Sequence, residues 1–275
     1  SPCAALWRAL PGVLGSAARR REALWYGRKL LAAGVRLRWG HTVFACEGDG
    51  RVQRAVIGAV DRDGRPRRGT ARTVEVDVVG TGFGLVPQIE LGQRLGCRTR
   101  WLAERGGHCL VVDPAQRTDV AGVFAVGEAC GIGGAEVAIA EGELAAAAIL
   151  QELRGTPVPP ALARHAAAER RAADRLLRAF APLPGLHELA RPDTIVCRCE
   201  DVTLQRARDA ARLHGDSLRA IKVGCRAGMG PCQARICGPS LQALASGDPG
   251  RPMDEPVVRV PLKPVRSDTI VRAPS

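Results

Sequence analysis

Apolar and polar positions repeat with two different periods over the first eighty residues, so this part of the chain mixes helix and strand. Residues 21–33 place leucines at helical spacing before Gly34, which predicts an amphipathic helix with a glycine stop. A strand-like run follows over 34–48. Residues 51–82 then alternate apolar and polar side chains around a turn, which predicts a hairpin or small meander closed by a buried strand at 76–82.

The run from Arg117 to Leu153 predicts a strand, a glycine-rich loop and a helix in succession. Segment 122–127 is short, apolar and ends at a glycine, as a buried strand does. Residues 135–153 are rich in alanine and have high helix propensity. This order aims backbone amides and the positive end of a helix dipole at the loop. Together with the preceding meander it is typical of the closing half of a nucleotide-binding α/β unit.

Proline and glycine at 154–160 break the pattern, and residues 161–180 predict a further helix beyond the break. A cysteine-bearing region follows. It contains a predicted helix over 201–215, with Asp201 or Thr203 placed to cap it, and a second helix that enters a glycine-rich turn.

These patterns divide the chain into four parts. We expect an α/β unit over 1–155, a helical linker over 156–190, a small, mainly helical unit over 191–247 and an extended tail over 248–275 that packs on a neighbour or is partly disordered. A length of 275 residues is enough for two units with apolar cores of their own.

Composition narrows the class of protein. The formal charge of +12 comes almost wholly from arginine, and aromatic residues are only 3% of the chain, which argues against specific nucleic-acid binding. The sequence contains no run of 18 or more uncharged apolar residues, so it predicts no membrane span. Ten cysteines in a long chain without a signal peptide favour a reducing, cytoplasmic location. The opening at Ser1 does not look like a natural start, so we expect a fragment or a processed chain.

Four cysteines form two closely spaced pairs. Cys197 and Cys199 are separated by one residue. After 32 further residues the second pair follows, Cys232 and Cys237. Two such pairs on tight loops can bring four thiolates around a small inorganic core. Gly224, Gly228 and Gly230 allow φ > 0 and let backbone amides point at sulfur. Structural zinc, a redox disulfide between Cys232 and Cys237, and plain buried thiols are the alternatives. The other cysteines that we considered are interpreted as buried thiols: Cys46, Cys97, Cys109 and Cys130.

The cysteine motifs carry a family resemblance. TIVCRCEDVTLQRARDA and IKVGCRAGMGPCQARICG resemble the 2Fe-2S domain named after the bacterioferritin-associated ferredoxin. The variant is the one found in flavoprotein subunits of opine, hydroxyproline and proline dehydrogenases and hydrogen cyanide synthase. The resemblance implies that a 2Fe-2S cluster is bound by Cys197, Cys199, Cys232 and Cys237. Cys225 falls where relatives often carry threonine and is not counted as a ligand.

A second resemblance covers the first half of the chain. VDVVGTGFGLVPQIELGQRLG and TDVAGVFAVGEACGIGGAEVAIAEGELAA are similar to the closing motifs of the two-dinucleotide-fold flavoproteins. This implies that Glu128, after Gly127, binds the ribityl chain of FAD. It also implies that the helix after Gly134 and Ala135 directs its amides at the flavin, and that the backbone at Gly82 passes close to the cofactor.

Both GxGxxG fingerprints, which hold the pyrophosphates of FAD and of a second nucleotide, are absent from the sequence. Relatives carry them upstream of the position where Ser1 begins. The expected fold class is therefore α/β, an incomplete two-dinucleotide-binding (Rossmann-like) flavoprotein fold followed by a small, mainly helical 2Fe-2S domain. The FAD site in this chain is expected to be incomplete, and NAD(P) binding stays open.

The resemblance implies an electron-transfer flavoprotein and iron-sulfur subunit of a heteromeric dehydrogenase that oxidises an amino acid or secondary amine. No residue is expected to act as a catalytic base, because substrate chemistry would belong to a catalytic flavoprotein partner subunit. The alternatives are a non-enzymatic zinc-binding or scaffold module and an inactive truncated remnant.

Overall fold

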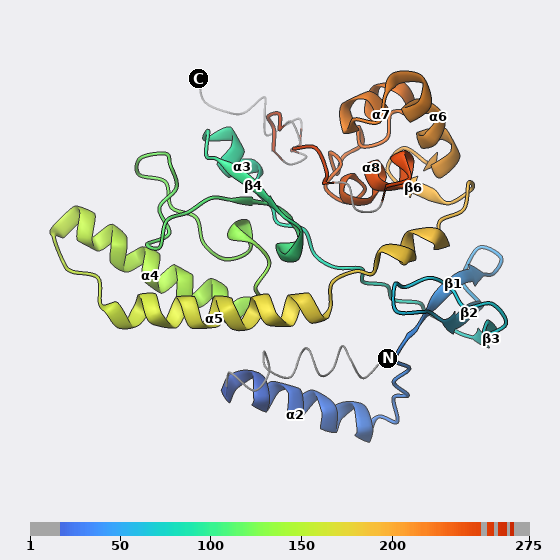
Figure 1. Ribbon diagram of the computed structural model, residues 1–275, viewed down its shortest axis with the longest axis horizontal. Coiled ribbons are helices and arrows are strands. Elements are labelled where there is room, and N and C mark those ends of the chain that lie inside the picture. Colours follow the sequence, from blue (N-terminus) through green and yellow to red (C-terminus); the bar gives the residue numbers. More distant parts are fainter. Residues whose placement is uncertain (1–16, 249–251, 256–257, 263–264, 267–275) are drawn as a thin grey trace.

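The computed structural model describes residues 17–248, 252–255, 258–262 and 265–266. It begins with helix α2 (Ala17–Ala32) and a three-stranded antiparallel sheet of β1 (His41–Glu47), β2 (Arg54–Ala59) and β3 (Arg72–Glu75), in that order (Figure 1). The predicted helix and meander are thus confirmed as elements, but the expected apolar face of the helix is not buried, since Leu24 and Leu31 are exposed. The turn between β2 and β3 is held by Asp61, whose Oδ1 accepts hydrogen bonds from the backbone amides of Asp63 and Arg65, both at 2.9 Å.

Two predictions for this region are wrong. Residues 76–82 form no strand, and the Val78 side chain is 80% exposed. A strand needs a paired neighbour. The Val76 amide still donates to the Gln53 oxygen at 3.0 Å, but beyond it no described strand pairs with this segment. Cys46 is exposed rather than buried. It lies on β1, an edge strand of this three-stranded sheet.

The next part is a hairpin beside a short helix. Helix α3 (Glu90–Arg94) leads into β4 (Thr99–Leu102), the 3-10 turn η1 (Ala103–Arg105) and β5 (Gly107–Leu110), which pairs antiparallel with β4. The strand predicted at 122–127 is an extended segment with one isolated bridge, between Arg117 and Phe124. Ala125 of this segment is still buried in a small core, together with Ile89, Cys97, Leu110 and Cys130.

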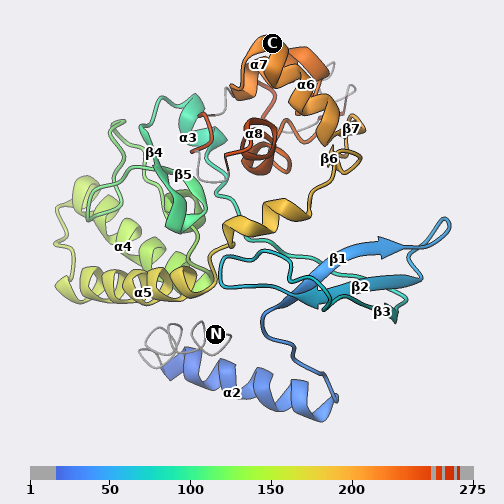
Figure 2. The same ribbon diagram turned by 45° about the vertical axis from the view of Figure 1, so that its right-hand side comes forward.

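Two long helices form a layer beneath this hairpin. Helix α4 (Ala135–Arg154) ends at Gly155, and helix α5 (Pro160–Ala179) runs back along it, as Figures 1 and 2 both show. Small side chains at the contact, Ala140 and Ala166 among them, let the two helices approach closely. Residues that the sequence assigned to a linker therefore pack on the first unit.

The cysteine-bearing unit is a cluster of short helices at the opposite end of the molecule (Figure 2). The order of its elements is η3 (Pro184–Leu189), β6 (Ile195–Cys197), β7 (Val202–Thr203), α6 (Leu204–His214), α7 (Leu218–Cys225) and α8 (Gly238–Ser246). Thr203 caps α6 through its hydroxyl, which accepts a hydrogen bond from the Arg206 amide at 3.4 Å. Leu204, Ile221 and Leu241 are fully buried in the core of this unit. Helix α8 was not predicted.

Residues 252–255 contact both units, whereas much of the predicted tail over 248–275 lies outside the described residues. The backbone oxygen of Met253 lies 2.8 Å from His108 Nε2, and Glu255 accepts a hydrogen bond from Thr99 at 2.5 Å, both on the first unit. Asp254 accepts a hydrogen bond at 3.0 Å from the amide of Leu218 on the cysteine-bearing unit. The helices in the described ranges include none that is both long and apolar enough to span a membrane.

Candidate functional site

The four predicted cysteines lie on two loops of the C-terminal unit. Cys197 ends β6 and is 1% exposed, and Cys199 follows it in a turn and is exposed. Cys232 is half-buried, and Cys237 is buried at the N-cap of α8. The structure therefore brings one member of each sequence pair into the interior and leaves the other member nearer the solvent.

The sulfurs associate across the two loops. The side chains of Cys199 and Cys232 are neighbours that influence each other's pKa, and so are those of Cys197 and Cys237. Burial, and secondarily the neighbouring Cys197, raises the pKa of the Cys237 thiol to about 12. In the parts of the chain that the structure describes, no three cysteine, histidine or acidic side chains gather closely enough to share a single metal ion. The four thiols thus form one group of mutually interacting side chains that joins the two loops.

Backbone amides surround these sulfurs. The amide of Gly228 donates to Cys197 Sγ at 3.4 Å. The pKa of the Cys232 thiol is lowered, because the nearby backbone amides and the Cys199 side chain outweigh the effect of burial. Such N–H donors stabilise thiolate charge, and around an iron-sulfur cluster they help to set its reduction potential. The donor set fits four thiolate ligands.

The glycines of this region act in different ways. Gly228 has φ +79° and delivers its amide to sulfur, as predicted. Gly224 and Gly230 do not have positive φ, so that part of the prediction is wrong. Each permits a close approach instead: a Cβ on Gly230 would lie 2.2 Å from the Cys199 Cβ, and one on Gly224 would lie 2.6 Å from the His214 ring.

The Cys225 thiol has a hydrogen-bond partner within its own helix. Cys225 ends α7, and its thiol donates a hydrogen bond at 3.1 Å to the Ile221 backbone oxygen one turn earlier in the helix. The omission of Cys225 from the ligand set stays a prediction.

The predicted flavin-facing residues lie on a short 3-10 turn, η2 (Gly127–Cys130), and at the start of α4. Glu128 is exposed, and Gly134 and Ala135 are exposed where α4 begins, with no side-chain cap on its first amides. Free amides at a helix N-terminus favour a negatively charged group. The turn and the helix start therefore suit a cofactor such as flavin, whose ring gains negative charge on reduction.

Gly127 does not offer its own amide to a cofactor. That amide donates to Glu141 Oε2 at 2.8 Å. Gly127 has φ +66°, and an added Cβ would come within 3.0 Å of Ala138. Gly82 lies apart in an exposed segment with open space where a Cβ would be, so no contact in the described structure ties it to the other four residues.

A buried ion pair beneath the turn was missed by the sequence reasoning. Arg170 of α5 donates to Glu141 of α4 through Nε and Nη2, at 2.8 and 2.9 Å, and the two side chains are 10% and 5% exposed. Arg170 also donates to the backbone oxygens of Gly127 and Gly131. The pair thereby fixes the turn that carries Glu128. Glu141 lies on the same helical face as Val137 and Leu144. A charged residue within an apolar stripe is the sequence feature from which a buried ion pair could have been predicted.

Cys97, Cys109 and Cys130 are buried, as predicted. Burial raises the pKa of the Cys109 thiol to about 11 and that of Cys130 to about 12. A thiol so far from its thiolate form is a poor nucleophile. These values argue against a redox role for Cys130.

Comparison with known proteins gives two family matches. Residues 5–142 match the pyridine nucleotide-disulphide oxidoreductase family, and residues 195–246 match the BFD-like [2Fe-2S] binding domain.

Curated relatives include an opine oxidase subunit of Rhizobium meliloti (strain 1021), 34% identical over 94% of this chain and 58% of that protein. Hydrogen cyanide synthase subunit HcnB of Pseudomonas aeruginosa is 31% identical over 74% of this chain and 45% of that protein. The chain thus spans about half the length of these relatives.

Among solved structures, L-proline dehydrogenase from P. horikoshii matches with a TM-score of 0.62 and 26% identity, over 83% of this chain and 44% of that one. The fold, the two family matches and the relatives agree with one another. The chain belongs to the pyridine nucleotide-disulphide oxidoreductase family and carries a C-terminal BFD-like [2Fe-2S] domain.

Proposed function

We propose that this chain is an electron-transfer subunit of a heteromeric flavin-dependent dehydrogenase, with a 2Fe-2S cluster on Cys197, Cys199, Cys232 and Cys237. The carrying observation is that these four thiols lie on two loops as mutually interacting neighbours, with the Gly228 amide donating to Cys197 Sγ at 3.4 Å. A binuclear iron core takes two thiolates on each iron, whereas a structural zinc site takes four around one ion.

Electron transfer requires a second redox group. The exposed start of α4 at Gly134 and Ala135, with Glu128 beside it, supports FAD binding, and Gly127 shapes the turn. Gly82 belongs to the proposal through the family resemblance alone. Flavin accepts two electrons together and an iron-sulfur cluster passes them singly, so the pair converts between two-electron and one-electron steps. NAD(P) has no binding residue in this proposal.

The relatives guide the rest of the proposal. The opine oxidase and hydrogen cyanide synthase relatives both carry names that make them parts of multi-subunit enzymes. We infer a catalytic flavoprotein partner that oxidises an amino acid or related secondary amine, in the cytoplasm. No side chain at the described site is placed as a general base, so the proposed role of this chain is to receive electrons and pass them on.

The proposal is tested by anaerobic purification followed by iron, acid-labile sulfide and zinc analysis and by paramagnetic resonance of the reduced protein. We expect two irons and two sulfides per chain. The variant Cys237→Ser should lose the cluster signal, whereas Cys225→Ser, which changes a buried thiol outside the two pairs, should keep it. A folded, colourless protein with one zinc per chain would favour a zinc-binding scaffold, and a folded protein without metal would favour an inactive remnant; either result would overturn the proposal.

A further inference from the structure

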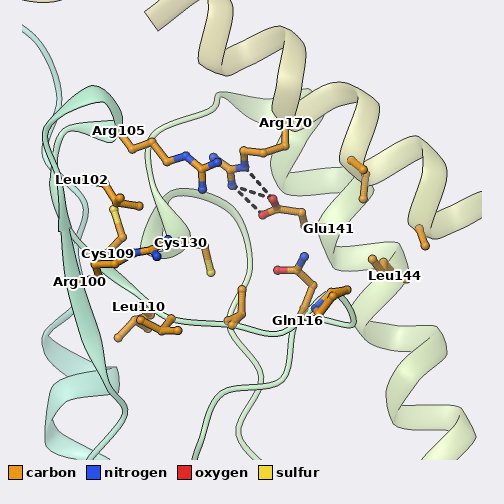
Figure 3. A pocket seen from close by; sticks show the side chains of 16 residues that line it. Arg100, Leu102, Arg105, Cys109, Leu110, Gln116, Cys130, Glu141, Leu144 and Arg170 are labelled. Carbon is orange, nitrogen blue, oxygen red and sulfur yellow. Dashed lines mark hydrogen bonds and ion pairs between the residues drawn. The ribbon is translucent and has the colours of Figure 1, made fainter. Parts of the chain in front are cut away.

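A cavity lies between the β4–β5 hairpin and the α4–α5 helix pair, away from the cysteine loops. Its volume is about 270 Å³ (Figure 3). Leu110 of β5, Leu144 of α4 and Ala166 of α5 give it apolar walls, and Arg100 and Gln116 are among its polar side chains. A mixed lining of this kind, apolar with a few placed polar groups, is usual for small-molecule sites.

Gln116 is the residue that points to a ligand. It is 92% buried, since 8% of it is exposed, and its Oε1 has no hydrogen-bond partner. Figure 3 shows the carboxamide directed into the cavity. A buried amide oxygen without a partner costs free energy, and a ligand donor would remove that cost.

The backbone holds Gln116 in this orientation. Its φ is +68°, a conformation that side-chain-bearing residues rarely adopt. A turn stabilises it: the Gln116 amide donates to the Asp113 backbone oxygen at 3.0 Å, and its own oxygen accepts from Ala125 at 3.1 Å. Strained residues that the surroundings hold in place cluster at binding sites.

Most other polar groups at the cavity are already paired. Glu141 and Arg170 bond each other, and Arg105 bonds both carboxylate oxygens of Asp174, at 3.0 and 2.8 Å. Arg100 differs, because none of the ion pairs found among the described residues includes it. Among the described residues, the cavity therefore offers one uncommitted cation and one uncommitted acceptor.

These two groups lie on different sides of the cavity. Figure 3 shows Arg100 on the hairpin side, while Gln116 lies on the α4 side below the Glu141 carboxylate. A ligand that satisfies both must present an anionic group to Arg100 and a hydrogen-bond donor to Gln116. Its remaining surface must be apolar to lie against Leu110 and Leu144.

We propose that this cavity binds a small aliphatic α-amino acid as a zwitterion. The carboxylate pairs with Arg100, the ammonium group donates to Gln116 Oε1, and the aliphatic side chain packs between Leu110 and Leu144. The site is a binding site without bond-making chemistry. It does not rest on the electron-transfer proposal, because none of these residues is among the proposed cluster or flavin contacts.

The test is calorimetric titration of the full chain with L-valine, and in parallel with isobutyrate and isobutylamine, which each keep one charged group. We expect saturable binding of L-valine and binding at least about tenfold weaker for each single-charge probe. Equal affinity for isobutyrate would overturn the zwitterion assignment. Absence of L-valine binding to the folded wild-type chain at millimolar concentration would overturn the site.

Variants locate the binding. Gln116→Leu should weaken L-valine binding by at least about tenfold. The control Gln151→Leu changes an exposed glutamine on α4, outside the cavity, and should leave affinity unchanged. If Gln116→Leu fails to fold, Ala163→Leu provides a second test, since Ala163 also lines the cavity and a larger side chain fills it. Unchanged affinity in a folded Ala163→Leu protein would place the ligand elsewhere and contradict the proposal.

Discussion

Arg235, which lies between Cys232 and Cys237 in the second cysteine loop, forms an ion pair with Glu90 at the start of helix α3. The two side chains are 21% and 18% exposed, so solvent screens the pair only partly. Arg235 also donates to the backbone oxygen of Leu262 in the tail. One side chain of the cysteine loop thus contacts the α/β unit and the tail together.

Breaking this contact should loosen the cysteine loop. In Glu90→Gln the ion pair is lost, at a cost of about 1 kcal/mol, and amides 232–237 are expected to exchange hydrogen several-fold faster. Hydrogen exchange with mass spectrometry measures this. The matched control is Glu188→Gln, which breaks the exposed pair with Arg65. Equal acceleration of the loop in both variants would show that the Arg235 contact does not restrain it.

The buried ion pair between Glu141 and Arg170 should contribute strongly to the free energy of unfolding. Arg170→Met leaves the Glu141 carboxylate buried without its partner, and we expect a loss of about 3–5 kcal/mol in the free energy of unfolding. The double variant Glu141→Leu with Arg170→Met should recover part of it. Urea denaturation measures both. As a control, Arg212→Met removes the exposed ion pair with Asp209 and should cost less than about 1 kcal/mol. A similar loss of stability in Arg170→Met and Arg212→Met would refute the assignment.

Local patterns were sufficient to predict several elements. The alanine-rich run after Gly134 became α4, and Thr203 caps α6, because helix propensity and capping act within a few residues. Strand pairing is not local in this way, which is why the strand predicted at residues 76–82 did not form. An apolar run becomes a strand only where a neighbour completes its hydrogen bonds, and pairing is a property of the whole sheet.

The candidate site was predictable only in part. The spacing and the family motifs predicted Cys197, Cys199, Cys232 and Cys237 as ligands, and the structure adds that their side chains interact across the two loops. Arg170 could not be found from the sequence. It lies 29 residues after Glu141 and is one of many arginines, and only the packing of α5 on α4 makes it a partner.

Gly230 should be essential to the first cysteine loop. A Cβ at this position would lie 2.2 Å from that of Cys199, a distance that real Cβ atoms do not tolerate, so Gly230→Ala must displace Cys199 or its own loop. We expect iron content to fall by at least about half if the proposed cluster is present. The control is Gly142→Ala in α4, where nothing lies within 4 Å and helix propensity predicts up to about 1 kcal/mol of stabilisation. Full iron content in a folded Gly230→Ala protein would contradict this role.

Acid should release the tail through Glu255. The hydrogen bond from Thr99, aided by one from Gln93, lowers the pKa of the Glu255 carboxyl below its ordinary value. A depressed folded-state pKa contributes stability that is present above the unfolded value and is lost as pH falls through the folded value. Hydrogen exchange around residues 252–255, corrected for intrinsic rates, should therefore accelerate below about pH 4. Glu255→Gln removes the titrating group, so its tail should show no such step; a step of the same size in that variant would assign the acid response to another residue.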